Sequence, residues 1–261
     1  MPFAQDIYYA QSPRAPGNEG TPALVLIHGA GGSRLHWPRE LRRLSLTDVY
    51  ALDLPGHGKS EGVGRQSVAA YAERLLEWMK DTWVERPVLV GHSMGGAIAL
   101  QAALDAPSAL AGLVLIGSGA RLRVADALLQ STMSEETMAQ AIQVFVEWSY
   151  SVGAARALRE LSERSLRETR ATVLHNDFVA CDGFDVMARL GELLLPVLVV
   201  CGSEDRLTPE KYSRYLAGHL PDARLVMLPG AGHMAMLEQP QASTQAVRAF
   251  IQERFAAPVN Q

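Results

Sequence analysis

A serine in a glycine-rich segment is the residue of this sequence best suited to covalent chemistry. Gly91-His92-Ser93-Met94-Gly95 matches the pattern G-x-S-x-G. The apolar run PVLV precedes it as a predicted strand, and the segment MGGAIALQAALDA follows it as a predicted helix. A sharp turn between the two would strain the serine, so its neighbours must lack bulk, and Gly91, Gly95 and Gly96 provide that room. The free N–H groups at the start of the helix would then point at a nucleophilic hydroxyl.

Short apolar runs and helical patterns alternate along the chain. The runs lack polar alternation, as expected of strands that are covered on both faces. They lie at residues 23–28, 49–52, 88–90, 113–116, 197–201 and 224–228. The predicted helices are 34–45, 67–83, 94–105, 209–219 and 240–255. This order predicts an α/β fold, a mostly parallel sheet flanked by helices, with the more alternating segment 6–10 as an antiparallel edge strand.

No strand pattern appears between Arg121 and Glu192. Helical patterns such as 135–148 and 152–170 fill this stretch, and a structureless loop of that length would be unusual. We therefore predict a helical cap, or lid, at 121–192, inserted into a core domain formed by 1–120 and 193–261. The cap is expected over the carboxyl ends of the strands, where open α/β sheets bind their ligands.

Four further motifs accompany the serine motif. They are VLIHGAGG at 25–32, DLPGHGKS at 53–60, GSEDRLTP at 202–209 and GAGH at 230–233. Together they resemble the oxyanion loop, the D-x-P-G-H-G-x-S loop, the acid loop and the histidine loop of the α/β-hydrolase superfamily, in that family's order and over nearly the whole chain. The strings GHSMGGAIAL and PGHGKSEG are similar to those of carboxylesterases and monoacylglycerol lipases. The resemblance implies the α/β-hydrolase fold and a hydrolytic activity.

A serine hydroxyl needs a general base, and the base needs an orienting acid. His233 follows the last predicted strand in a glycine-rich loop that lets its side chain reach back over the sheet, so we predict that it is the base. The resemblance places the acid at Asp205, with the adjacent Glu204 as the alternative. The resulting order of serine, acid and histidine is that of α/β hydrolases.

Backbone donors and a pocket complete the predicted site. The N–H of Met94, at the helix start, is expected to stabilise an oxyanion, and the resemblance adds the N–H of Ala30. The resemblance also implies that His28 and His57 brace loops, although His28 lies close enough to the serine to be a pocket candidate. The candidate pocket residues are His28, Gly29, His92, Phe145 and Trp148.

These residues predict a serine esterase that cleaves carboxylic esters with short to medium acyl chains through an acyl-enzyme on Ser93. The same triad serves relatives that hydrolyse carbon–carbon bonds of meta-cleavage diketones or open enol lactones, and both reactions remain alternatives. A non-catalytic receptor for a small ligand is the remaining class. No cofactor is expected, because the loop 29–32 lacks the Rossmann and P-loop patterns. No histidine, cysteine or carboxylate spacing indicates a metal.

The composition and charge limit which binding partners and which cellular compartment are expected. The 261 residues are 48% hydrophobic and 20% charged, which predicts a soluble globular protein. With a net charge of -4 and no cluster of basic residues, nucleic-acid binding is not expected. The first residues lack a signal-peptide pattern and no apolar run approaches the ~20 residues that span a bilayer, so we expect a cytoplasmic protein without a stable membrane anchor. A homodimer formed through apolar cap surface is left open.

Overall fold

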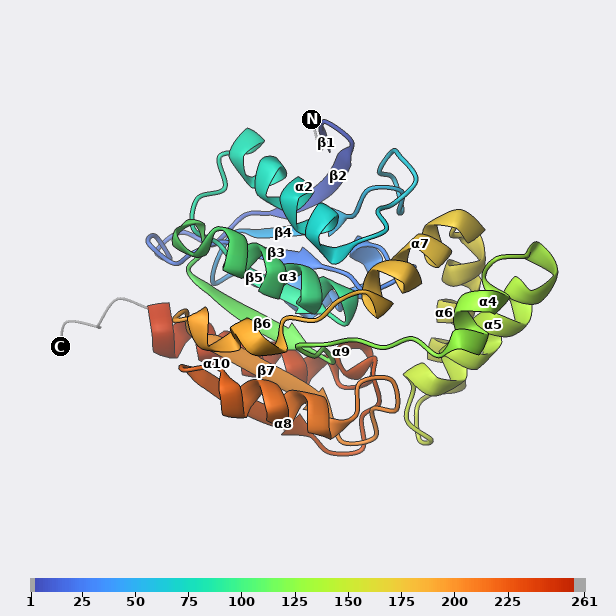
Figure 1. Ribbon diagram of the computed structural model, residues 1–261. Coiled ribbons are helices and arrows are strands. Elements are labelled where there is room, and N and C mark those ends of the chain that lie inside the picture. The colour runs from blue at the N-terminus through green and yellow to red at the C-terminus, as the bar shows by residue number, and fades with distance from the viewer. Residues whose placement is uncertain (1–2, 256–261) are drawn as a thin grey trace.

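An eight-stranded sheet with helices on both faces dominates the computed structural model, which describes residues 3–255 (Figure 1). The strand order is β1-β2-β4-β3-β5-β6-β7-β8, and the six strands from β4 to β8 in that order run parallel. The predicted fold class is therefore confirmed. The strands are β1 (Phe3–Ala4), β2 (Ile7–Ser12), β3 (Leu24–Ile27), β4 (Val49–Asp53), β5 (Val88–His92), β6 (Gly112–Ile116), β7 (Val197–Gly202) and β8 (Ala223–Leu228). Residues 1–2 and 256–261 of the predicted core domain lie outside the described residues.

All six predicted parallel strands are present, each shifted by a residue or two at its ends. The segment predicted as an antiparallel edge forms β2, which does pair antiparallel with β4. It is not the edge, however, because β1 pairs with its outer side. β1 has only two residues, which is too short for a strand pattern to be recognised in the sequence.

The continuous apolar runs are explained by a core on each face of the sheet. In β3, Val25 and Ile27 pack towards one face, and Leu24 and Leu26 pack towards the other. Because successive side chains of a strand point to opposite faces, a strand covered on both sides needs apolar residues at every position. The first face is covered by α2 (Val68–Asp81), α3 (Met94–Asp105) and α8 (Glu210–His219), and the second by α1 (Arg39–Arg42) and α10 (Pro240–Phe255).

The prediction of one helix at 34–45 is wrong. The segment forms a short 3-10 helix, η1 (Arg34–His36), and then the single turn of α1. Pro38 lies between them with an extended ψ of 149°. Proline lacks the N–H that a continuous helix needs and its ring clashes with the preceding turn, so the helix restarts after it.

Four helices and a 3-10 helix lie between β6 and β7. They are α4 (Asp126–Ser131), α5 (Glu135–Ser149), α6 (Arg156–Glu168), α7 (Ala171–Asp182) and η3 (Met187–Glu192). The predicted helix 152–170 is shorter than expected and is followed by the separate helix α7, because Arg170 is extended, with ψ of 138°. Figure 1 shows α4 to α7 beyond the end of the sheet to which β6 points. The remaining elements are η2 (Pro107–Ala109) and α9 (Ala235–Glu238).

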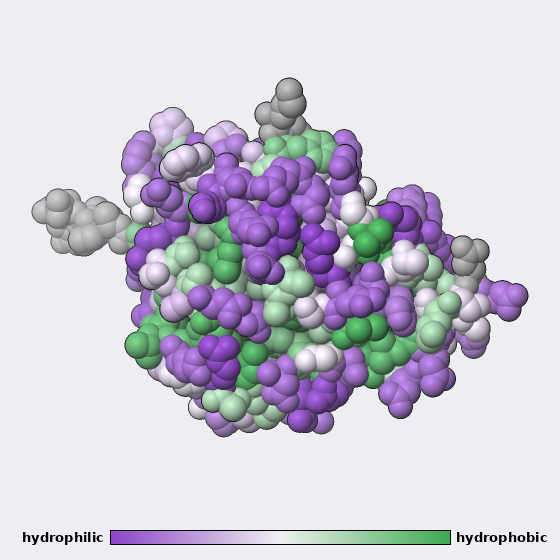
Figure 2. Space-filling model, turned by 45° about the horizontal axis from the view of Figure 1, so that its top comes forward, coloured by the Kyte–Doolittle hydropathy of each residue, from purple (hydrophilic) through white to green (hydrophobic). Residues whose placement is uncertain are grey.

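Apolar side chains of this insertion continue the core of the second sheet face. Ile142, Leu166 and Phe178 belong to the same buried cluster as Trp37 and Phe250 of the core. None of the helices within residues 3–255 is long and apolar enough to cross a bilayer. On the face drawn in Figure 2, hydrophilic residues cover most of the upper part, and hydrophobic residues form patches among them below.

Candidate active site

Ser93 occupies a strained turn between β5 and α3. Its φ of 53° and ψ of -118° are unusual for a residue with a side chain. The turn is held by two hydrogen bonds, from the N–H of Ser93 to the carbonyl of Ile116 at 2.9 Å and from the hydroxyl of Ser118 to the carbonyl of Ser93 at 2.8 Å. A Cβ on Gly95 would overlap the backbone carbonyl of Ile27. The backbones pack so closely here that only glycine fits, as the sequence predicted for the residues around Ser93.

We expect Gly95→Ala to lower the free energy of unfolding by about 3 kcal/mol or more, because neither backbone can move away without breaking the sheet. The matched control is Gly218→Ala. Gly218 lies in helix α8, is exposed, and has nothing within 4 Å of an added Cβ. This change should stabilise the protein by about 0.5–1 kcal/mol, since alanine favours helix. Urea unfolding of both variants measures the contrast, and equal effects would contradict the close approach at Gly95.

His233 and Asp205 form a buried pair at the carboxyl ends of the last two strands. Nδ1 of His233 lies 2.9 Å from Oδ2 of Asp205, and the histidine and the aspartate are 1% and 6% exposed. The hydroxyl of Thr208 donates to the same carboxylate oxygen at 2.8 Å and lies 3.2 Å from Nδ1. The carboxylate therefore holds the proton of the histidine on Nδ1 and leaves Nε2 as a base.

The environment keeps Asp205 ionised although it is buried. Burial alone would raise its pKa, but the attraction of His233 and the hydrogen bonds to the carboxylate outweigh it, so the pKa is lowered. Oδ1 accepts hydrogen bonds from the backbone N–H groups of Leu207 and Thr208, at 2.9 and 2.8 Å. Hydrogen bonds to the charged form of a carboxyl group favour that form.

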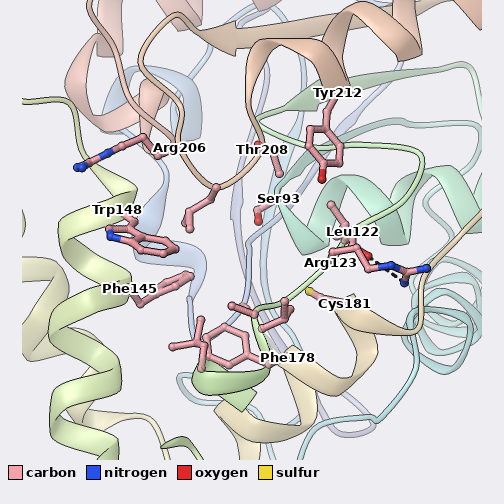
Figure 3. A pocket seen from close by; sticks show the side chains of 15 residues that line it. Ser93, Leu122, Arg123, Phe145, Trp148, Phe178, Cys181, Arg206, Thr208 and Tyr212 are labelled. Atoms are coloured by element: carbon pink, nitrogen blue, oxygen red, sulfur yellow. Dashed lines mark hydrogen bonds between the residues drawn. The ribbon is translucent and has the colours of Figure 1, made fainter. Parts of the chain in front are cut away.

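Ser93 lies at the junction of two cavities. The larger, of about 240 Å³, is lined mainly by apolar side chains, with Phe145 and Trp148 of α5 on one side and Phe178 and Cys181 of α7 on another (Figure 3). The guanidinium groups of Arg123 and Arg206 point away from Ser93 in this view.

The smaller cavity, of about 20 Å³, is lined by both Ser93 and His233. Within residues 3–255, the buried Nε2 atom of His233 has no hydrogen-bond partner. This atom therefore has a lone pair free to take a proton, and its ring shares a cavity with Ser93.

The loop 29–32 presents its backbone to both cavities. Ala30 lines each of them together with Ser93. The carbonyl of Gly29 accepts hydrogen bonds from Nδ1 of His28 at 2.8 Å and from the N–H of Gly32 at 3.0 Å. Because this carbonyl and the N–H of Ala30 belong to one trans peptide group, they point in opposite directions, and the N–H is fixed with them. Met94 is the first residue of α3, where backbone N–H groups have no partner within the helix.

The structure separates the five candidate pocket residues. Gly29, His92 and Phe145 line the smaller cavity, and Phe145 and Trp148 line the larger one. His28 lines neither cavity, so its placement in the pocket is corrected: it is fully buried, and its Nε2 accepts a hydrogen bond from the N–H of Leu54 at 3.0 Å. Burial, and then repulsion from His57, hold the pKa of His28 well below its usual value, so the ring is a neutral brace.

Three residues of the site were missed by sequence reasoning. Thr208 lies in the predicted acid loop, and its position three residues after Asp205 was a signal for an additional bond to that carboxylate. His36 lines the smaller cavity, where burial and then the charge of His57 lower its pKa to about 4. Asp177, on α7, bonds to the loop that contains Ala30. Nothing in its local sequence reveals this contact, because the partners are distant in the chain.

Comparisons with known proteins identify the family of this chain. The model of the alpha/beta hydrolase family matches residues 24–246, so the chain belongs to that family. It is 30% identical over 243 residues to the putative carbamate hydrolase RutD of Pseudomonas syringae pv. syringae (strain B728a), covering 88% of this chain and 93% of that protein. A solved structure of a thermophilic esterase is 33% identical, with a TM-score of 0.83 and coverage of 97% of both chains.

A longer relative matches over only part of its length. The chain is 31% identical over 253 residues to the dihydrolipoyllysine-residue acetyltransferase component of the acetoin cleaving system of Pseudomonas putida. The match covers 91% of this chain but 65% of that protein.

Proposed function

We propose that this hydrolase cleaves carboxylic esters with a triad of Ser93, His233 and Asp205. The observation that carries the proposal is the buried His233–Asp205 pair, whose histidine lines the same cavity as the strained serine and has no hydrogen-bond partner on Nε2. A serine, a base and an acid with these roles define acyl transfer to serine. The likeness to a thermophilic esterase at 33% identity supports ester hydrolysis in particular.

The proposed reaction follows from the positions of these groups. Ser93 attacks the acyl carbon while Nε2 of His233 takes the hydroxyl proton, and Asp205 stabilises the imidazolium that forms. The N–H groups of Ala30 and Met94 stabilise the oxyanion, each donor contributing about 3 kcal/mol. His233 then protonates the leaving alcohol. Water enters, gives its proton to His233, and releases the acid by the reverse path.

The two cavities suggest which part of the ester is small. The leaving alcohol must lie next to His233, which protonates it, and His233 lines the cavity of about 20 Å³. The acyl chain then occupies the apolar cavity of about 240 Å³, whose size suits short to medium chains. Because Phe145, Trp148, Phe178 and Cys181 come from the insertion at 121–192, we propose that the insertion acts as the cap that shapes this acyl pocket.

An ester series tests both the reaction and the assignment of the cavities. Methyl esters from acetate to laurate are hydrolysed in a pH-stat, and turnover is expected to peak between butyrate and octanoate. With the best acid, replacing the methyl alcohol by n-hexanol should lower kcat/KM by about tenfold or more, because both are primary alcohols of similar intrinsic reactivity and the smaller cavity has less room for the longer one.

Two outcomes of this series would contradict the proposal in different ways. Equal rates for methyl and n-hexyl esters would contradict the assignment of the alcohol to the smaller cavity. Turnover of enol lactones or meta-cleavage diketones, without turnover of any ester, would contradict ester hydrolysis while keeping the triad.

A further inference from the structure

A buried carboxylate of the insertion contacts three separate parts of the core. Asp177 of α7 is 0% exposed. Its Oδ2 accepts hydrogen bonds from the N–H of Gly31 and from Nε2 of His57, both at 2.8 Å, and its Oδ1 accepts one from the hydroxyl of Tyr71 at 2.6 Å. A charge without such partners would be very costly at this depth, so the three contacts specify where the carboxylate lies.

The charge of Asp177 is balanced by His57. Nδ1 of His57 lies 3.1 Å from the carbonyl of Pro55, and Nε2 faces Asp177, so both ring nitrogens face acceptors and both donate. Burial by itself lowers the pKa of His57, but the adjacent carboxylate outweighs it and raises that pKa. The pair is therefore an ion pair that ties the insertion to the loop at 53–60.

Gly31 is held by the insertion through both of its backbone groups. Its N–H donates to Asp177, and its carbonyl accepts a hydrogen bond from the hydroxyl of Thr169 at 3.1 Å. Its φ of 63° favours glycine, and an added Cβ would lie 2.6 Å from Leu166 and 2.9 Å from Leu174, so the insertion also packs directly on it. The peptide group that follows Ala30 is thus fixed from the insertion, whereas the peptide group before Ala30 is fixed from the core through His28.

We propose that Asp177 is a positioning residue for the oxyanion donor: by fixing the peptide group that follows Ala30 it holds the far side of this residue and limits the movement of the Ala30 N–H, whose own peptide group is held from the core through His28. The insertion would then contribute to the rate of the reaction as well as to the pocket. This inference rests on the proposed function, since it concerns the same serine chemistry. It assigns to α7 a role that is separate from lining the acyl cavity, because Asp177 does not line it.

The test compares variants that differ in whether they keep an acceptor for Gly31. Asp177→Ala removes the acceptor and should lower kcat by about 10- to 100-fold with little change in KM, the effect expected when an oxyanion donor is displaced. Asp177→Asn keeps a carbonyl oxygen for the N–H of Gly31 and should recover most of this loss. Tyr71→Phe removes a different bond to Asp177 and should lower the melting temperature without a comparable loss of kcat.

A second readout separates positioning from stability. A trifluoromethyl ketone analogue of the best substrate forms a tetrahedral adduct on Ser93 whose oxyanion uses the same donors. Its inhibition constant for Asp177→Ala should rise by the factor by which kcat/KM falls, at a temperature at which circular dichroism shows the variant folded. If Asp177→Ala does not fold, Thr169→Val replaces it, with a smaller change in the same direction.

The inference and the proposed function fail in distinguishable ways. Wild-type turnover of esters, with kcat and ketone inhibition unchanged in Asp177→Ala or, where that variant does not fold, in Thr169→Val, would overturn the positioning role alone. A wild-type protein inactive on every ester would overturn the proposed function. The rate of Ser93 labelling by a fluorophosphonate, whose phosphoryl oxygen needs the same donors, would then decide the inference: a slower rate in Asp177→Ala supports it, and equal rates overturn it.

Discussion

Ser93→Ala should lower kcat for the best methyl ester by about 10⁴- to 10⁶-fold, because the variant lacks the proposed nucleophile and retains only the proposed oxyanion donors and substrate binding. The structure gives the reason for so large an effect. Among residues 3–255, Ser93 is the one that combines a strained backbone with contact to both cavities, and one of these cavities is also lined by His233, whose Nε2 has no partner. The pH-stat rate measures the loss, and mass spectrometry after fluorophosphonate treatment should show label on the wild type only.

Ser108→Ala is the matched control for this change. Ser108 lies in η2, just beyond the far end of the helix that begins after Ser93, and it is exposed. Its kcat should stay within about threefold of wild type, as expected of a surface substitution. Substantial turnover by a folded Ser93→Ala protein, equal to that of Ser108→Ala, would rule out the acyl-enzyme on Ser93.

Asp205→Asn should lower kcat by about 10³- to 10⁴-fold. The two backbone donors at Oδ1 would retain the amide oxygen there, which places the amide NH₂ group opposite Nδ1 of His233. The histidine would then have to accept at Nδ1 and carry its proton on Nε2, where it can no longer remove the proton of Ser93. The variant is expected to keep its fold, since the side chain has the same shape.

Glu204→Gln is the control that separates the two adjacent carboxyl groups. Glu204 is exposed, and its Oε2 accepts a hydrogen bond from the N–H of Val152 at 3.2 Å. Its kcat should remain within about threefold of wild type. A loss in Glu204→Gln as large as that in Asp205→Asn would show that the acid of the triad is assigned to the wrong residue.

The strands of the sheet could be predicted from the sequence because both of their faces are buried. A run such as that at 197–201 leaves little choice of structure, since it is apolar at every position and ends in glycine. The segment 34–45, which forms two short helices instead of the one predicted, shows that apolar spacing alone does not fix where a helix begins or ends. There the apolar spacing suggested one helix, and the single residue Pro38 decided otherwise.

In the insertion, too, the type of secondary structure was easier to predict than its boundaries. Its helical nature follows from the absence of strand patterns, whereas the boundary between α6 and α7 has no glycine or proline to mark it. Its division from the core at 121 and 192 stays a prediction.

The sequence by itself determined the order of the chemical groups and the turn that holds the serine, because these depend on residues that are neighbours along the chain. The glycines beside Ser93, the carboxyl groups that follow one predicted strand and the glycine-rich loop that carries His233 after the next are each local features, and their resemblance to the loops of α/β hydrolases assigns their roles. Only the tertiary structure decided what depends on distance in space. In the structure, His28 braces the loop through Gly29 and Leu54 and does not line the pocket. The space around Ser93 is divided into a larger and a smaller cavity. Asp177 binds Gly31, from which it is separated by 146 positions in the sequence. A buried carboxylate finds its partners through packing, which no local pattern encodes.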